Sequence, residues 1–151
     1  MATLRCESTV VIAKPPAEVF AWLLEADKVG RWTSGLEVYE PLTPGPLGVG
    51  SKIREELLVS GQRLRFEMEI TTLEPPRAAE LRFEGSGFRA VNRYGISAEG
   101  DGARVTWAIE GETTSFTARM LAPMVQSRLQ EKLEGDLARL REVLVSSGAA
   151  A

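Results

Sequence analysis

The 151-residue sequence contains no histidine and only one cysteine, Cys6. Without an imidazole, the chain lacks the usual general base of serine and cysteine nucleophiles and the commonest ligand of zinc, copper and non-haem iron. A single cysteine also excludes an internal disulfide and a multi-cysteine metal site, so we treat Cys6 as structural. We therefore expect no metal and no cofactor, and any chemistry would rest on carboxylates, tyrosine, lysine, arginine, serine or ordered water.

Long apolar runs and blocks of one charge are also missing. The 18 basic residues are interspersed with 21 acidic ones for a net charge of -3, so no basic footprint for nucleic acid or an anionic membrane is visible. The opening stretch MATLRCESTVVIAKPP has neither the apolar centre of a signal peptide nor a segment that could span a bilayer. We expect a cytoplasmic protein with no nucleic-acid partner and no integral membrane association.

The composition is that of an ordinary globular domain, with 44% hydrophobic and 26% charged residues. A chain of this length fits one domain, which buries roughly 70% of the surface of its unfolded chain. We expect a single domain over residues 1–146 and a frayed tail over 147–151. Its oligomeric state does not follow from the sequence.

Two adjacent prolines, Pro15 and Pro16, mark the first corner of the chain. Residues 4–13 read as a strand, and a proline cannot donate to a strand ladder, whereas the first turn of a helix tolerates one. A short helix is therefore predicted to begin near Pro16, followed by a second helical turn over residues 27–32.

The two tryptophans of this segment are predicted to play different roles. At helical spacing, Phe20, Leu24 and Asp27 face the core. Trp22 points the other way and is expected to be half exposed. Trp32 closes the second turn and is a candidate for the rim of a cavity, although packing in the core is the favoured interpretation of the two.

The middle of the chain reads as strands. After a strand over residues 36–39, the loop 41–50 holds three prolines and three glycines, which is typical of a lip or cover segment. Residues 51–113 then alternate between apolar and charged positions, and the hairpin signals GSG and EGDG separate successive runs. This pattern predicts a meander of antiparallel strands whose charged face meets water.

The C-terminal part reads as one long helix. From about Ala118 to Leu144 apolar residues follow a helical period along one broad stripe. Pro123 predicts a kink near its start. Strand, two short helices, antiparallel sheet and long helix together make a two-layer α+β domain, in which a curved sheet that grips a helix leaves a cavity between them.

Three ordered stretches carry a family resemblance: VVIAKPPAEVF at residues 10–20, DKVGRW at 27–32 and LEPPR at 73–77. Together with the sheet and the terminal helix they resemble the START / Bet v 1-like (SRPBCC) superfamily, especially its polyketide cyclase/dehydrase-like branch. The resemblance implies a helix-grip fold, in which a curved antiparallel sheet of six to seven strands wraps around the C-terminal helix and two short helices follow the first strand.

The same resemblance implies a container for lipids, polyketides or other apolar molecules, and a minority of such proteins are cyclases or aromatases. A related branch resembles activators of the Hsp90 ATPase. That branch usually carries a tryptophan in the strand after its PPR segment, whereas residues 79–85 here read AELRFEG.

Two polar residues stand in the inward phase of a predicted strand. Asn92 and Tyr94 alternate in step with Phe88 and Ile96, so their polar atoms point to the interior, where an unpaired group costs about 1–3 kcal/mol. A ligand, a buried water or a neighbouring strand could satisfy them. The apolar residues on the same face could likewise be plain core.

Glu55 raises the same question, because the inward phase of KIREELLV contains Ile53, Glu55 and Leu57. A carboxylate on that face would have its charged form disfavoured and could serve as a general acid or base. A one-residue bulge or the strand end would instead place Glu55 in water, and the sequence favours this second arrangement. Asp136, with Lys132 four residues before it, is expected to reach solvent or a basic or amide partner.

These observations lead to three hypotheses. The first is a non-catalytic protein that binds or transports a small hydrophobic molecule between the sheet and the C-terminal helix, with the loop 41–50 and the Pro123 kink gating its mouth. The second is an enzyme of the polyketide cyclase kind, with Glu55 and Tyr94 as weak catalytic candidates. The third is a protein-interaction module, which would expose apolar surface around Trp22 and Trp32. The residues expected to line a ligand site are Trp32, Glu55, Phe66, Met68, Phe83, Phe88, Asn92, Tyr94, Trp107, Met120 and Met124.

Overall fold

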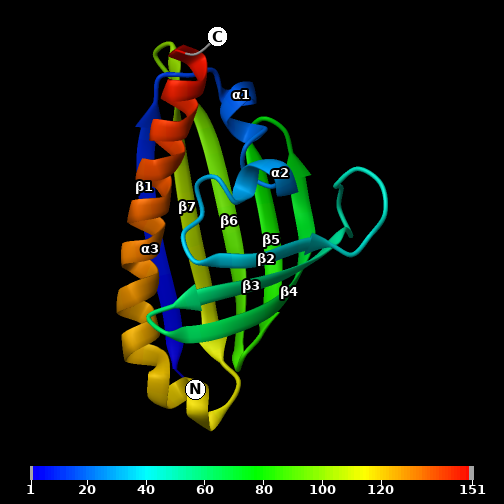
Figure 1. Cartoon of the computed structure of the whole chain (residues 1–151), viewed down its shortest axis with the longest axis vertical. Coiled ribbons are helices and arrows are strands. Elements are labelled where there is room, and N and C mark those ends of the chain that lie inside the picture. The colour runs from blue at the N-terminus through cyan, green and yellow to red at the C-terminus, as the bar shows by residue number, and fades with distance from the viewer. Residues whose placement is uncertain (1, 150–151) are drawn as a thin grey trace.

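Seven antiparallel strands form one sheet in the order β1-β7-β6-β5-β4-β3-β2, as Figure 1 shows in a computed structural model that describes residues 2–149. Each strand from β2 to β6 pairs with the next one in sequence, and β1 closes against β7. This is the meander that the alternating pattern predicts. The strands are β1 (Thr3–Ile12), β2 (Leu36–Pro41), β3 (Lys52–Val59), β4 (Gln62–Glu74), β5 (Ala78–Gly85), β6 (Phe88–Glu99) and β7 (Gly102–Thr113).

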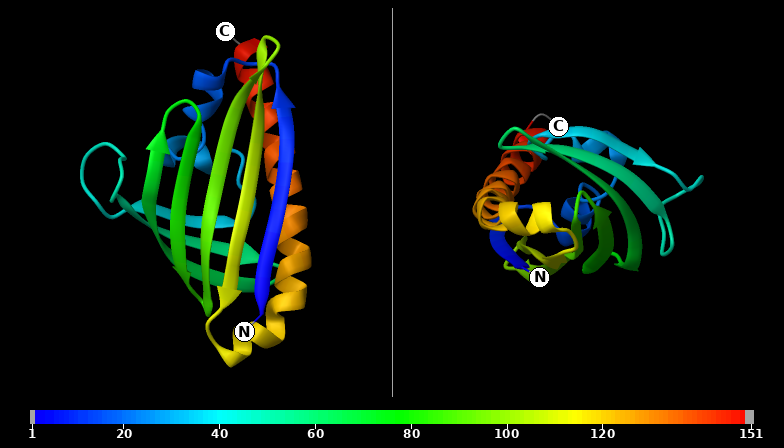
Figure 2. Two further views of the ribbon diagram at one scale, coloured as in Figure 1. Left: turned by 180° about the vertical axis from the view of Figure 1, so that it is seen from behind. Right: turned by 90° about the horizontal axis from the view of Figure 1, so that it is seen from below.

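The sheet is strongly curved, and the long helix α3 (Phe116–Ala149) fills its concave side. The end view in Figure 2 shows the sheet curling around the interior, with α3 beside β1 where the curl stays open. The helix contacts both β1 and β3, so it bridges the two arms of the curl. The structure therefore has the predicted helix-grip architecture.

The short helices α1 (Pro16–Phe20) and α2 (Ala26–Val29) follow β1. Because α1 ends after five residues, the helical spacing predicted beyond it does not apply, and two predictions were wrong. Asp27 is exposed instead of facing the core. Trp22 is only 7% exposed, and the Arg31 guanidinium covers its ring at 4.8 Å from the centroid.

The helix α3 is continuous through Pro123, although its first turns run at an angle to the rest (Figure 2). Proline has no N–H for the helical ladder, which explains a bend at this place. Beyond the bend, Leu133, Leu137 and Leu140 are fully buried against the sheet. The helical backbone is described up to Ala149, so the last two residues of the predicted frayed tail lie outside the described residues and the domain boundary stays a prediction.

The hydrophobic core is divided into two clusters along the length of the molecule. The upper cluster lies around the short helices and the C-terminal half of α3, and it includes Trp32, Trp107 and Leu137. The lower cluster lies around the first turns of α3 and includes Phe66 and Phe88. Strand residues and α3 residues belong to both clusters, so a space between the clusters lies between sheet and helix.

Candidate ligand-binding cavity

A cavity of about 60 Å³ lies between the two core clusters. Most of its wall is apolar, and both clusters contribute to it. The strands supply their inward-facing side chains, α3 supplies one further wall, and α2 and the turns beside the short helices close the upper side. The lining residues are Leu4, Leu23, Leu24, Val29, Thr33, Tyr39, Glu55, Leu57, Val59, Leu64, Phe66, Met68, Leu81, Phe83, Phe88, Asn92, Tyr94, Trp107, Ile109, Val125, Leu129 and Lys132.

The structure brings most of the predicted ligand-site residues to this cavity. They come from the five neighbouring strands β3 to β7. Alternate residues of a strand point to the same face, which explains why the sequence pattern could group them. The residues that line it are Glu55, Phe66, Met68, Phe83, Phe88, Asn92, Tyr94 and Trp107.

Three predicted site residues lie elsewhere. Trp32 is 2% exposed and packs behind the cavity wall, edge-on to Trp107 with ring centroids 5.6 Å apart. Its indole N–H donates to the carbonyl of Trp22 at 2.9 Å. Met120 is 67% exposed at the start of α3, and Met124 packs against the outside of the lower cluster. Trp32 therefore packs in the core, and the two methionines do not reach the cavity.

The loop 41–50 also lies apart from the cavity, because the lining contains none of its residues. In Figure 1 this loop projects away from the side covered by α3. Within the residues that the structure describes, the loop is not the lip of this cavity, contrary to the sequence prediction. The physical reason is that β2 pairs with β3 up to Pro41, opposite Ile53, and the two strands carry their connection out beyond the sheet.

Glu55 points into the cavity. The pairing of β3 with β4 is continuous from Lys52 to Val59, so the bulge that would have turned Glu55 outward is absent from this ladder. The arrangement favoured from the sequence was therefore wrong. Tyr39 on β2 and Phe66 on β4 stand directly opposite Glu55 in the sheet register, and all three side chains reach the cavity wall.

The carboxyl of Glu55 has an unusual electrostatic environment. Removal from bulk water raises its pKa to about 7, while the nearby Lys132 ammonium lowers this pKa and the Asp136 carboxylate raises it. Within the described part of the chain, Glu55 makes no hydrogen bond or ion pair. Glu55 lines the cavity, so a carboxyl whose pKa is raised to about 7 faces this space.

Three side chains on β6 and β7 form a connected group on the facing wall. The indole N–H of Trp107 donates to the amide oxygen of Asn92, and the amide nitrogen of Asn92 donates a long 3.5 Å bond to the Tyr94 hydroxyl. The rings of Tyr94 and Trp107 stack with centroids 5.4 Å apart. Burial raises the pKa of the Tyr94 hydroxyl, so this group stays protonated.

A buried ion pair lies at the α3 side of the cavity. Lys132 and Asp136, one helical turn apart, approach within 2.6 Å, and their side chains are only 8% and 3% exposed. The backbone N–H of Ser34 donates to the other oxygen of Asp136 at 3.0 Å, and Lys132 donates to the carbonyl of Ser34. Asp136 thus has the basic and amide partners that the sequence led us to expect.

Gly35 allows the chain to make this approach. It has φ of 71°, and a Cβ at this position would collide with the carbonyl of Leu58. A glycine here lets the turn before β2 pass close to β3 and present the Ser34 backbone to α3.

Sequence reasoning missed several polar lining residues, above all Tyr39, Thr33 and Lys132. The strand position of Tyr39 opposite Glu55 depends on a register shift between Leu36 and Val38, which no sequence pattern shows. Lys132 falls on the flank of the apolar stripe of α3. Its spacing to Asp136 was the one available signal, and it indicated a pair without showing that the pair is buried.

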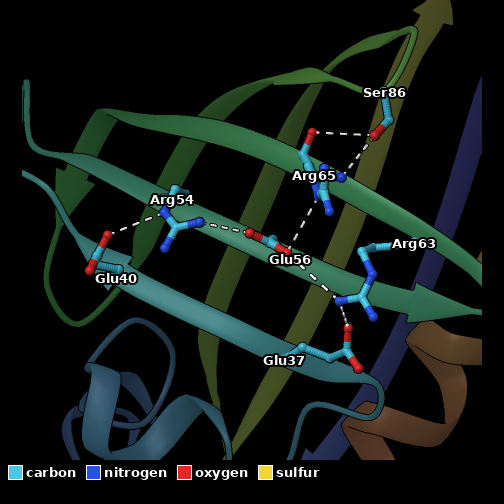
Figure 3. A network of polar contacts seen from close by, with 7 residues as sticks. All are labelled: Glu37, Glu40, Arg54, Glu56, Arg63, Arg65 and Ser86. Atoms are coloured by element: carbon cyan, nitrogen blue, oxygen red, sulfur yellow. Dashed lines mark hydrogen bonds and ion pairs between the residues drawn. The ribbon is translucent and has the colours of Figure 1, made fainter.

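On the outer face of β2, β3 and β4, charged residues alternate along each strand with the residues that face the interior. Figure 3 shows Glu56 among three arginines, with Arg54 at 2.7 Å, Arg65 at 3.5 Å and Arg63 at 3.8 Å. Arg63 also pairs with Glu37 on β2. Such cross-strand pairs agree with the predicted solvated face.

Residues 2–149 lack two further classes of site. No cluster of three or more acidic, histidine or cysteine side chains that could hold a metal ion is found there. No helix in the same residues combines the length and the hydropathy that a membrane crossing requires.

Comparisons with known proteins agree with the architecture. The family described as "Polyketide cyclase / dehydrase and lipid transport" matches residues 3–145. The comparison with curated proteins finds no match. Among solved structures, TTHA0849 from Thermus thermophilus is 23% identical with a TM-score of 0.77, over 97% of this chain and 99% of that one.

Two other solved structures are similar at lower identity. Ara h 8.0201 is 14% identical with a TM-score of 0.72, over 96% of this chain and 99% of that one. A conserved protein from Geobacillus kaustophilus is 14% identical with a TM-score of 0.73, over 95% of this chain and 97% of that one. At these identities the similarity shows a shared fold.

Proposed function

We propose that this chain, which belongs to the polyketide cyclase / dehydrase and lipid transport family, binds a small and largely apolar molecule in the cavity between its two core clusters. The observation that carries the proposal is the wall itself. Apolar side chains surround a space to which only a few polar groups, including Glu55, Asn92 and Tyr94, are directed. This is the usual composition of a small-molecule site, in which burial supplies affinity and isolated polar groups fix orientation.

The size of the cavity limits the ligand or requires movement. Its volume of about 60 Å³ is small beside the roughly 300–1,000 Å³ of typical ligand pockets. A larger ligand would have to displace flexible lining side chains. Met68 and Phe83 suit this role, because methionine adapts its shape readily and Phe83 packs against both clusters, at their boundary.

Native mass spectrometry of the purified full-length protein tests this proposal directly. We expect the wild-type protein to retain or take up a small hydrophobic molecule. Val125→Phe, which adds a ring at the cavity wall, should abolish this uptake. Val91→Phe, on the outer side of β6, is the matched control and should leave uptake intact. Equal uptake by both variants, or none by the wild type across a lipid and polyketide-like panel, would refute the proposal.

Acid–base catalysis in the same cavity is a second candidate, favoured by one observation. A Glu55 carboxyl with a pKa of about 7 can give or take a proton at neutral pH, and the protonated Tyr94 hydroxyl faces the same space. If a cyclisation substrate is found, Glu55→Gln should lower kcat far more than KM. Unchanged turnover in both Glu55→Gln and Tyr94→Phe would exclude these catalytic roles.

The interaction-module hypothesis receives less support. It rested on an exposed apolar surface around Trp22 and Trp32, and both side chains are buried.

A further inference from the structure

The hydrogen-bonding capacity of the cavity is largely used up by the protein itself. Lys132 has three N–H donors, and these meet the carbonyl of Ser34, the hydroxyl of Ser34 at 3.3 Å and Asp136 at 2.6 Å. The ammonium therefore has no donor left for a ligand. Although it lies at the cavity wall, its role toward a ligand is limited to its charge.

Two other donors at the wall are also occupied. The hydroxyl of Tyr39 donates to the carbonyl of Leu24 at 2.6 Å, so only its lone pairs remain for the cavity. The indole N–H of Trp107 is taken by Asn92. These bonds hold the wall in place. Besides Tyr94, the donors that remain among the described lining residues are the hydroxyl of Thr33, in the turn before β2, and the second N–H of the Asn92 amide.

Glu55 is the opposite case. Every fully enclosed side-chain nitrogen and oxygen among residues 2–146 has a hydrogen-bond partner, whereas the Glu55 oxygens have none. Those oxygens must therefore touch the open space of the cavity. On the β2 and β3 side the cavity thus offers acceptors: two carboxyl oxygens of Glu55 and the lone pairs of Tyr39.

The wall formed by β6 offers a hydrogen-bond donor, the hydroxyl of Tyr94. The Tyr94 hydroxyl accepts only the long bond from Asn92, and in the described part of the chain no acceptor meets its own proton. A hydroxyl group is a donor and an acceptor at once. It can donate to an acceptor-rich wall and accept from a donor.

We infer that the ligand of this cavity is an alcohol or a phenol, a small apolar molecule whose hydroxyl donates a hydrogen bond to Glu55 and accepts one from Tyr94. This inference rests on the proposed function and adds the chemical class of the ligand. The amine class is less well matched, because Lys132 already supplies the positive charge beside Glu55.

Binding of such a ligand should be coupled to a proton. The charged or titratable groups that face Glu55 are Tyr39 on β2, Tyr94 on β6, and Lys132 and Asp136 on α3. Only Glu55 has a pKa near neutrality among the groups with a resolved shift. A donor ligand favours its ionised form, so binding near pH 7 releases a fraction of a proton and the affinity rises with pH up to about 7.

The experiment compares three probes of nearly equal shape: 4-methylphenol, toluene and 4-methylanisole. Their dissociation constants are measured by NMR on the full-length protein, with the indole N–H signal of Trp107 as the reporter at the cavity wall. We expect 4-methylphenol to bind at least tenfold more tightly than the other two. Glu55→Leu should remove this preference while toluene still binds, and Glu67→Gln, an exposed carboxyl on the outer face of β4, should keep it.

Calorimetry at pH 7 in two buffers of different ionisation enthalpy supplies an independent measurement. Wild type should release a fraction of a proton on binding 4-methylphenol, and Glu55→Gln, which preserves the shape of the side chain, should release none. If the three probes bind wild type equally, or the phenol preference survives in Glu55→Leu, this inference is wrong and the proposed function stands. If none of the probes binds wild type, the inference falls, while the ligand panel above tests the proposed function separately.

Discussion

Glu55 and Glu56 are neighbours in β3, yet they occupy opposite electrostatic environments. Glu56 lies on the outer face with a side chain 12% exposed, and three arginines surround it. Glu55 lies on the inner face without a partner in the described residues, and its pKa rises to about 7. One step along a strand separates a carboxylate held by ion pairs from a carboxyl that faces an apolar cavity.

The difference shows that the outer face of this sheet carries ion pairs, whereas its inner face encloses polar groups in apolar surroundings. Outside, pairs such as those in Figure 3 can be lost singly because the remaining partners and water compensate. In the interior, Lys132 on α3 has a hydrogen-bond acceptor for each of its three N–H groups. Glu55 on β3 has carboxyl oxygens that accept no hydrogen bond from the described residues. Substitutions inside and outside should therefore differ in their cost to stability, with the largest loss at the buried ion pair.

Asp136→Ala removes one half of the buried ion pair and leaves Lys132 enclosed without its carboxylate. We expect it to lower the free energy of unfolding by about 3–5 kcal/mol, measured by urea denaturation. Glu40→Ala, which breaks an exposed pair with Arg54 at 3.2 Å, should cost about 1 kcal/mol or less. Similar losses in both variants would show that inner and outer pairs do not differ.

Glu55→Gln is expected to stabilise the empty protein above neutral pH. The folded carboxyl keeps its proton to about pH 7, whereas a free glutamate loses it near pH 4.5, so between these values the folded state binds more protons. Wild-type stability should therefore fall as the pH rises through this window.

The glutamine variant has no carboxyl at this position, so it lacks this pH-dependent loss of stability. The stability difference between Glu55→Gln and wild type should grow from pH 4.5 to pH 7 by at most about 3 kcal/mol and stay constant above. Urea denaturation at a series of pH values measures it. Parallel stability curves for the two proteins would contradict the enclosed position of Glu55.

Glu56→Gln tests the outer face at the adjacent position. We expect a loss of about 1 kcal/mol that shrinks in high salt, because the three arginines that pair with Glu56 are 46–70% exposed and salt screens their charges. Denaturation at low and high ionic strength would reveal it. A loss that is large and independent of salt would mean that Glu56 behaves as a buried partner.

Tyr94→Phe should have the smallest effect on stability, within about 0.5 kcal/mol. Its hydroxyl receives only a 3.5 Å contact from Asn92, so its removal leaves few bonds broken, and the ring still stacks on Trp107. Thermal unfolding would measure the change. A marked destabilisation would indicate that the hydroxyl has a protein partner and is not available to a ligand.

Much of the fold could be predicted because it follows from periodicity. The alternation over β4 and β6 placed Phe66, Asn92 and Tyr94 on the inner face, and the long apolar stripe predicted α3. The family resemblance added the order of the elements. These patterns are local in the sequence, and the structure contains each element that they predict.

The rest depended on contacts between distant segments. The early end of α1 turned Trp22 into the core, and no residue spacing showed where that helix would stop. The inward position of Glu55 required an unbroken β3 ladder, and its enclosure required α3 to arrive with Lys132 and Asp136. A sequence pattern can assign a side chain to a face, but the partners that define its chemistry come from other elements.

The division of the core into two clusters has a mechanical consequence. An interior with empty space occupies more volume folded than its unfolded chain does in water, so hydrostatic pressure favours unfolding. The compressible part of this molecule is the gap between the clusters, spanned by Phe83 from the sheet. Under pressure the upper and lower clusters should be driven together there, and a molecule that fills the gap would make the protein harder to compress.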